Sequence, residues 1–161
     1  MNKNLLLLIG GVLIIVGLVK PNFDTVVPSP TPSSVASVEK PGDSNLLELS
    51  NKVAQVLKDN NASKSDCVRL SGLYGDLATL ISLDEKDEVL KTTEEVRQAN
   101  RIAGLMLKMN LNDKYPNLAS TMNSLVVKTM GDDNVPLNKE LRAKAVSAFK
   151  ALSWATLEGA K

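Results

Sequence analysis

Four carboxylates stand close together in the sequence and form its densest acidic cluster: Asp84, Glu85, Asp87 and Glu88. Such a cluster could hold a metal ion, but its spacing is not that of a calcium loop, whose oxygen ligands alternate over about twelve residues. Carboxylates in the first turn of a helix also interact favourably with the helix dipole. We therefore interpret the cluster as a helix start capped by Ser82, and we predict no metal site there.

Two other segments, residues 59–61 and 132–134, resemble the beginning of a calcium loop. Such a loop closes on a bidentate acidic side chain about a dozen positions after its first ligand. Counting from the first residue of each segment brings that position to Leu70 and to Ala143, neither of which is acidic. Both segments are interpreted as loops, and the sequence predicts no metal and no cofactor.

The side chains that enzymes use for proton transfer and nucleophilic attack are absent or poorly placed. The chain has no histidine, which excludes His-based triads, Cys–His dyads and His-ligated metals. The acidic residues fall at predicted helix starts, in loops or on polar faces, and no pair stands out for general acid–base catalysis. Ser71 and Gly72 lack the strand–turn–helix context of a nucleophile elbow. We predict no catalytic residue and a non-enzymatic protein; an envelope-acting hydrolase is the less favoured alternative.

The other reactive or charged side chains favour structural roles. Cys67 is the only cysteine, so a disulfide within the chain is excluded, and we expect it to be a small buried side chain. Arg97 and Arg101 lie one helical turn apart and could bind an anion, but we interpret them as a solvated face. A net charge of +1 and 3% aromatic residues argue against a nucleic-acid partner.

Trp154 is the only tryptophan and the most informative single side chain. It falls in a predicted helix over residues 139–157, but it points away from that helix's main apolar face, which holds Leu141, Ala145, Ala148, Phe149 and Leu152. Val146 and Leu157 lie on its side of the helix. Since aromatic side chains often anchor interfaces, we predict Val146, Trp154 and Leu157 as a candidate partner surface. The alternative is packing against a neighbouring helix.

Helices must position these side chains, because apolar residues recur with helical spacing from Asp43 onward. The predicted helices cover residues 46–58, 66–81, one or two helices between 83 and 109, 116–130, and 139–157. Their expected caps and first residues are Asn45 with Glu48, Ser65, Ser82 with Glu85, Thr92 with Glu95, Pro116, and Asn138. Gly131 is expected to end the fourth of these segments.

Residues 96–109 are apolar on nearly all sides, which is typical of a central helix, and Gly104 would permit a close helix crossing there. No alternating strand pattern flanked by hairpin turns is found. The sequence therefore predicts an all-α fold, in which residues 43–161 form a compact bundle of five or six helices.

An unbroken apolar run, residues 5–19, lies between Lys3 and Lys20. As a helix it would be about 22 Å long, which is short for a hydrocarbon core of roughly 30 Å unless the lysines reach toward the interfaces. We predict that residues 1–20 form an uncleaved transmembrane helix or signal-anchor. The residues expected to embed in lipid are Leu5, Leu8, Ile9, Val12, Ile15 and Val19.

The alternative is a cleaved signal peptide, because the positive start and the apolar core also fit one. The small residues of a cleavage site do not follow the run, however, and first occur at residues 34–36. A Pro/Ser/Thr-rich linker, residues 21–42, comes next, with alternating prolines that favour extended polyproline II structure. At about 3.1 Å per residue it could hold the helical domain up to roughly 65 Å from the membrane. A docking site for a proline-recognition groove is the alternative role.

These features predict a single-pass, membrane-tethered helical interaction module, with its C-terminal domain in the periplasm or outside the cell. The expected partners are the lipid bilayer, through the N-terminal helix, and a protein or a second copy of the chain. The style of the sequence suits a phage or bacterial envelope factor. The alternative function is a secreted soluble helical protein or virion component after signal cleavage.

Overall fold

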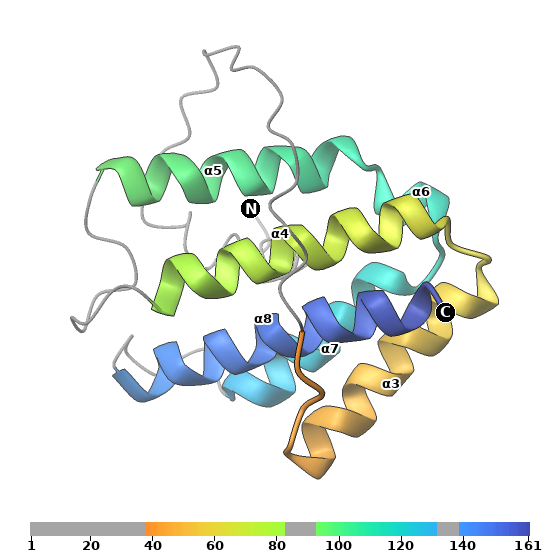
Figure 1. Cartoon of the computed structure of the whole chain (residues 1–161), viewed down its shortest axis with the longest axis horizontal. Coiled ribbons are helices and arrows are strands. Elements are labelled where there is room, and N and C mark those ends of the chain that lie inside the picture. Colours follow the sequence, from red (N-terminus) through yellow and green to blue (C-terminus); the bar gives the residue numbers. More distant parts are fainter. Residues whose placement is uncertain (1–37, 83–92, 132–138) are drawn as a thin grey trace.

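The computed structural model of the chain describes residues 38–82, 93–131 and 139–161 (Figure 1). Within these ranges every regular element is a helix and no strand occurs, which confirms the predicted all-α fold for this part of the chain. The helices are α3 (Ser44–Asp59), α4 (Lys64–Ser82), α5 (Thr93–Lys108), the single turn α6 (Leu111–Lys114), α7 (Leu118–Met130) and α8 (Lys139–Gly159). The predicted apolar anchor and most of the predicted linker lie outside the described residues.

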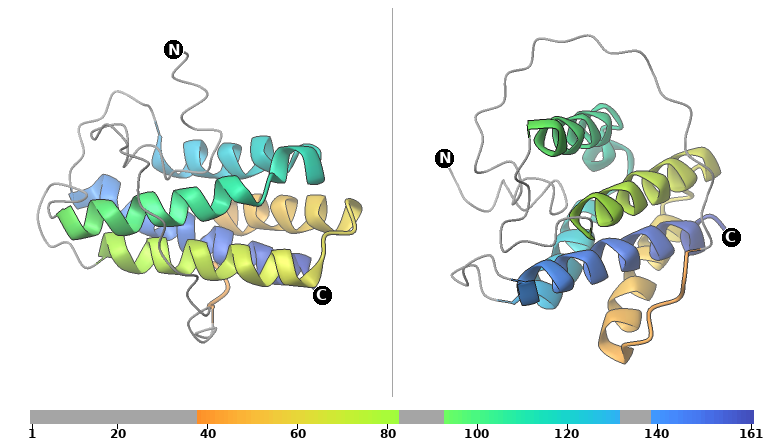
Figure 2. Two further views of the ribbon diagram at one scale, coloured as in Figure 1. Left: turned by 90° about the horizontal axis from the view of Figure 1, so that it is seen from above. Right: turned by 60° about the vertical axis from the view of Figure 1, so that its left-hand side comes forward.

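Helix α8 is the centre of the bundle. It packs against α4, α3 and α7, and α4 in turn separates it from α5 (Figures 1 and 2). The side of α8 that faces the viewer in Figure 1 is the one that these three helices leave open. Small buried residues on several sides of α8 allow its neighbours to come close; they include Ala145, Ala148, Ala151 and Ala155. The predicted main face of this helix is confirmed, since its five apolar residues are all buried.

Helix α5 lies at the edge of the bundle, so the prediction of a central helix over residues 96–109 is wrong. It packs chiefly on α4, and Leu107 is 50% exposed. Its buried Ile102 and Met106 lie one turn apart and mark a single apolar face. The run of consecutive apolar residues in this segment is short, and it hid the polar side of the helix, on which Arg101 and Lys108 are exposed.

The close helix crossing is made at a different glycine from the predicted one. A Cβ at Gly104 would meet no atom within 4 Å, so that residue permits no close crossing. A Cβ at Gly159, at the end of α8, would lie only 2.8 Å from Leu57 Cβ and Cδ1 of α3. The absence of a side chain at Gly159 therefore allows α3 and α8 to touch.

Two predicted helix starts are wrong, because a neighbouring residue acts as the cap. The N-cap of α3 is Asp43, whose Oδ1 accepts a hydrogen bond from Leu46 N at 2.8 Å, whereas Asn45 and Glu48 lie inside the helix. At the start of α4, Ser63 rather than Ser65 accepts a hydrogen bond from the backbone N–H of Asp66, at 3.1 Å. Each cap lies two residues before the predicted one, so both helices begin earlier than expected.

The other helix ends vary in their agreement with the sequence. Helix α7 begins at Leu118 after Asn117, which has a positive φ of 67°, and not at Pro116 as predicted. Gly131, with a φ of 87°, ends α7 as predicted, because glycine adopts that conformation without strain. Helix α8 is described from Lys139 and continues to Gly159, two residues beyond its predicted end. The expected caps Glu85, Thr92 and Asn138 lie outside the described residues.

Candidate functional site

The predicted partner surface lies along the open side of α8. Seven residues follow one another there at steps of three or four, so they share one helical face. We call them the α8 outer face: Lys139, Ala143, Val146, Lys150, Trp154, Leu157 and, just beyond the helix end, Lys161. The three lysines and Ala143 are exposed, and the three large apolar side chains are half-buried. The three predicted partner residues therefore do lie together, on a single face.

Trp154 has one side against the bundle and one side in solvent. Trp154 and Val146 both pack against the hydrophobic core from its rim, while Leu157 is half-buried beside them. The sequence left two roles open, packing within the bundle and a partner surface. The geometry is compatible with both, since Val146 and Trp154 pack against the core and are still partly exposed. Whether that surface binds a partner stays a prediction.

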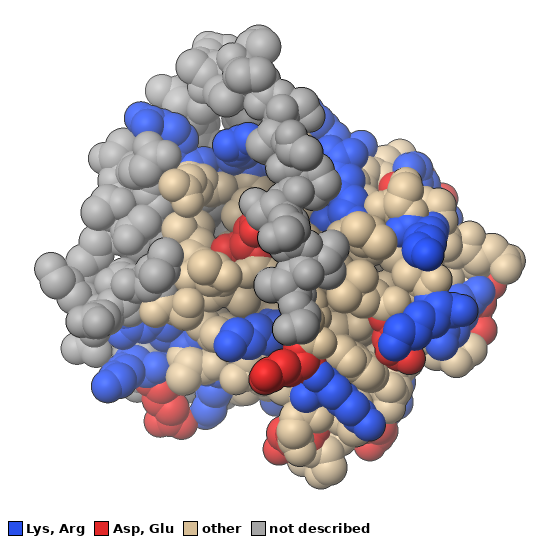
Figure 3. All heavy atoms as spheres, in the orientation of Figure 1, with Lys and Arg blue, Asp and Glu red and all other residues tan. Residues whose placement is uncertain are grey.

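Charge along the α8 outer face is positive. No acidic residue occupies the seven positions, and the two flanking glutamates each pair with a lysine. Lys144 Nζ lies 2.9 Å from Glu140 Oε1, and Lys161 Nζ lies 2.7 Å from Glu158 Oε2. Figure 3, in the same orientation as Figure 1, shows lysine and arginine side chains spread over this side of the molecule.

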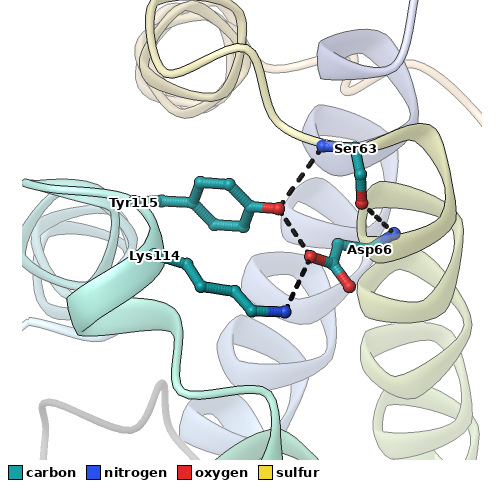
Figure 4. Close-up of polar contacts among 4 residues, drawn as sticks. All are labelled: Ser63, Asp66, Lys114 and Tyr115. Atoms are coloured by element: carbon teal, nitrogen blue, oxygen red, sulfur yellow. Dashed lines mark hydrogen bonds and ion pairs between the residues drawn. The ribbon is translucent and has the colours of Figure 1, made fainter.

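A polar cluster of four residues, which sequence reasoning missed, joins the start of α4 to the α6–α7 region (Figure 4). The Tyr115 hydroxyl donates a hydrogen bond to Asp66 Oδ2 at 2.5 Å, and Lys114 Nζ lies 3.3 Å from the same oxygen. The backbone N–H of Ser63 donates to the Tyr115 hydroxyl at 3.3 Å. We call Ser63, Asp66, Lys114 and Tyr115 the α4–α6 clasp.

The electrostatics of the clasp favour a structural role over catalysis. The hydrogen bond from Tyr115 is the main reason that the pKa of Asp66 is lowered, and Lys114 adds to the effect against the opposing influence of partial burial. Asp66 is thus held as a carboxylate, and its Oδ2 already accepts from both neighbours. Since the phenol donates its proton to that carboxylate, neither group is arranged to take a proton from a substrate. The Asn60 side chain adds a further link by donating to Pro116 O at 3.2 Å.

The clasp has little signature in the sequence because its main partners are far apart along the chain. Asp66 and Tyr115 are 49 residues from one another, so no local spacing brings them together. The one available signal is the position of Asp66 at the start of a predicted helix, where a carboxylate interacts favourably with the helix dipole. That role is compatible with the observed contacts but does not predict them.

Ser71 is buried in the middle of α4 and pairs with Ser153 of α8. Ser153 Oγ donates to Ser71 O at 2.8 Å, and the two hydroxyl oxygens lie 3.0 Å apart. Because the Ser153 proton is used on the carbonyl, the Ser71 hydroxyl is the donor between the two side chains. Ser71 is 2% exposed and is part of a helix–helix contact.

Two further titratable side chains are buried in the core. Cys67 is fully buried, as predicted, and burial raises the pKa of its thiol, which keeps it protonated. Burial also raises the pKa of Tyr74, whose hydroxyl donates to Met122 Sδ at 3.4 Å. The Tyr74 ring stacks on Phe149 of α8, with centroids 6.3 Å apart. These contacts are those of a packed core.

The remaining predicted features are the acidic cluster, the two loops and the membrane span. The acidic cluster at residues 84–88 and the segment 132–134 lie outside the described residues. The loop predicted at residues 59–61 is confirmed, since α3 ends at Asp59 and Asn61 has a positive φ of 49°. Among the described residues, no group of three or more potential His, Cys, Asp or Glu ligands is placed to hold a metal. No helix in the described ranges is long and apolar enough to cross a membrane.

The described part of the chain thus belongs to the class of small all-helical bundles, in which a polar clasp joins α4 to the α6 region and the α8 outer face carries lysines and the tryptophan. No protein-family model, curated protein or solved structure matches the chain.

Proposed function

We propose that the chain is a non-enzymatic, membrane-tethered module that acts by surface contact. Residues 5–19 hold it in the bilayer, the linker sets its reach, and the helical domain presents the contact surface outside the cytoplasm. The observation that carries the contact role is the α8 outer face. It places the only tryptophan beside Val146 and Leu157, half-buried, on the side of α8 that its neighbouring helices leave open.

The non-enzymatic part of the proposal is supported by how the polar side chains are used. The clasp brings a carboxylate, a phenol and an ammonium group together, which is the kind of set that could move protons. Its hydrogen bonds instead join the start of α4 to the α6 region. Ser71 is likewise engaged in the α4–α8 contact.

The charge pattern of the α8 outer face disfavours a second copy of the chain as the partner. In a two-fold symmetric, antiparallel pairing of this face, Lys150 would meet Lys150 and Lys139 would meet Lys161. Like charges placed opposite one another at an interface are destabilising. The face therefore suits a partner with negative charge better than it suits itself.

The tether is tested by the membrane residence of the full chain. We expect the protein to float with the membrane fraction and to resist alkaline extraction. Replacing Val12 in the middle of the apolar run with lysine should release it, because a lysine near the bilayer centre costs about 3 kcal/mol. A matched Val27→Lys change in the linker should have no effect. Recovery of the unmodified chain in the soluble fraction would refute the tether.

A further inference from the structure

We propose that the α8 outer face binds the anionic surface of the membrane in which the chain is tethered, so that the bundle lies against the lipid rather than standing off at the end of its linker. This inference rests on the proposed tether and names the partner of the same surface. Its central residues are Trp154 and Leu157, flanked by Lys150 and Lys161.

The residue types on this face are those that a membrane–water interface selects. Tryptophan places an apolar ring among lipid headgroups while its N–H stays hydrated, and lysine extends its ammonium toward the lipid phosphates. An interfacial helix typically carries such apolar residues with lysines beside them. On α8 the apolar Val146, Trp154 and Leu157 are interleaved with three lysines along one stripe.

Charge complementarity points to the same occupant. From Lys139 to Lys161, the exposed part of α8 and its C-terminal end carry four lysines against two glutamates. Lys144 and Lys161 pair with the glutamates, so the excess positive charge is that of Lys139 and Lys150. The stripe itself contains no acidic residue. A surface of this sign is attracted to anionic headgroups, and the attraction falls off within a Debye length of the membrane.

The described chain begins on the same side of the bundle as the α8 outer face. Residues 1–37, with the apolar run, precede the described chain, which begins at Val38. Residues 38–43 start beside α8 on its open side and run away from it to the start of α3 (Figures 1 and 2). Val38 and Pro41 of this segment are half-buried against the bundle. Its Glu39 and Lys40 are both exposed and leave the sign of the surface unchanged.

The single tryptophan makes the proposal directly measurable in the full chain. The protein is reconstituted into phosphatidylcholine vesicles, with or without anionic phosphatidylglycerol, in which the acyl chains are brominated or not. Bromine quenches tryptophan only at close range, so quenching reports insertion of Trp154 into the leaflet. We expect quenching in the anionic vesicles, reduced by added salt. We also expect little quenching in pure phosphatidylcholine.

Charge variants separate docking from tethering. Each lysine removed from the stripe should reduce the ratio of docked to undocked protein about fivefold, so Lys139→Gln with Lys150→Gln should reduce it about twenty-five-fold. The control pair is Lys108→Gln with Lys128→Gln, which lie exposed on α5 and α7 and should leave quenching unchanged. Circular dichroism of both pairs verifies that the bundle remains folded.

Three results would overturn the proposal. The first is absence of quenching by brominated anionic lipid, and the second is equal quenching in both lipids with no effect of the stripe variants. The third is protection of Trp154 from acrylamide quenching that increases with the density of protein in the vesicles, in the absence of quenching by brominated lipid. That result would assign the face to a protein partner. Flotation with phosphatidylcholine vesicles is scored separately: a chain that floats but shows no quenching keeps its tether and loses only the docking face.

Discussion

The contact between Gly159 and Leu57 provides a sharp test of how α8 is packed. In a Gly159→Ala variant the new Cβ would lie 2.8 Å from Leu57 Cβ and Cδ1 and 3.4 Å from Ala54 O. Carbon atoms in contact prefer about 3.5–4.0 Å, so α3 and α8 must separate by roughly 1 Å at this point. Leu57 is fully buried and its Cβ is fixed to the backbone, so a rotamer change alone does not relieve the clash.

We expect Gly159→Ala to destabilise the bundle by about 1–3 kcal/mol, the usual cost of overpacking a core. Gly104→Ala is the matched control, because its Cβ would meet no atom within 4 Å and alanine is favoured over glycine in a helix. That variant should be more stable than the unmodified protein by about 0.5–1 kcal/mol. The assay is urea unfolding of residues 38–161, followed by far-ultraviolet circular dichroism.

A double-mutant cycle assigns the cost to the contact itself. Leu57→Ala alone should destabilise by about 2–5 kcal/mol, since it leaves a cavity. In that background Gly159→Ala should cost less, because the contact with Leu57 Cδ1 is gone, but some cost should remain, because alanine keeps the Cβ that lies 2.8 Å away. The expected coupling energy is about 0.5 kcal/mol or more. The reasoning is refuted if Gly159→Ala is neutral in the unmodified protein, or if its cost is the same in both backgrounds.

Three further variants test the polar contacts. The lowered folded pKa of Asp66 stabilises the protein above the unfolded value of about 3.9, and this stabilisation is lost as the pH falls through the folded value. Tyr115→Phe should therefore lower the free energy of unfolding by about 1–2 kcal/mol at neutral pH, and the variant should lose less stability in acid than the unmodified protein. A urea midpoint of the unmodified protein that stays the same from neutral pH to below 3 would contradict this. Ser153→Ala removes the acceptor of the buried Ser71 hydroxyl and should cost about 1–3 kcal/mol by urea unfolding, whereas a cost below 0.5 kcal/mol would mean that the hydroxyl finds another partner. Asp43→Ala removes the N-cap of α3 and should lower the free energy of unfolding by about 1 kcal/mol. A neutral effect would mean that another residue caps the helix.

The sequence predicted best those features that depend on local periodicity. The helical class, the main face of α8, the end of α7 at Gly131 and the burial of Cys67 all follow from apolar spacing, glycine conformation or side-chain chemistry. Helix starts were less predictable because several residues able to cap stand side by side. Asp43 and Asn45 both fit the start of α3, and only the backbone conformation at Asp43 decides between them.

Features that depend on contacts between distant segments were missed. The centre of the bundle is α8, whose buried alanines are weak signals in a hydrophobic pattern, rather than α5, whose local run of apolar residues suggested that position. The pairing of Asp66 with Tyr115, and the approach of Gly159 to Leu57, join residues that are far apart along the chain. Their prediction requires the tertiary arrangement, because no local propensity favours one such pair over another.

The partner surface was predicted from three residues on one side of a helix, and the structure adds what surrounds them. Val146, Trp154 and Leu157 could be grouped from helical spacing alone. That they lie on the side of α8 left open by its neighbours, and that the described chain begins on that side, depends on how α3, α4 and α7 pack around α8. The lysines are visible in the sequence, but only the packing of α8 shows that they share its open face with Trp154.

The central claim, that the helical domain stays attached to an uncleaved membrane anchor, is tested most directly by the intact mass of the protein recovered from alkaline-washed membranes. The account predicts a mass that includes residues 5–19 and the whole helical domain. A mass corresponding to a chain that begins after Val19 would contradict it and would favour a secreted helical protein.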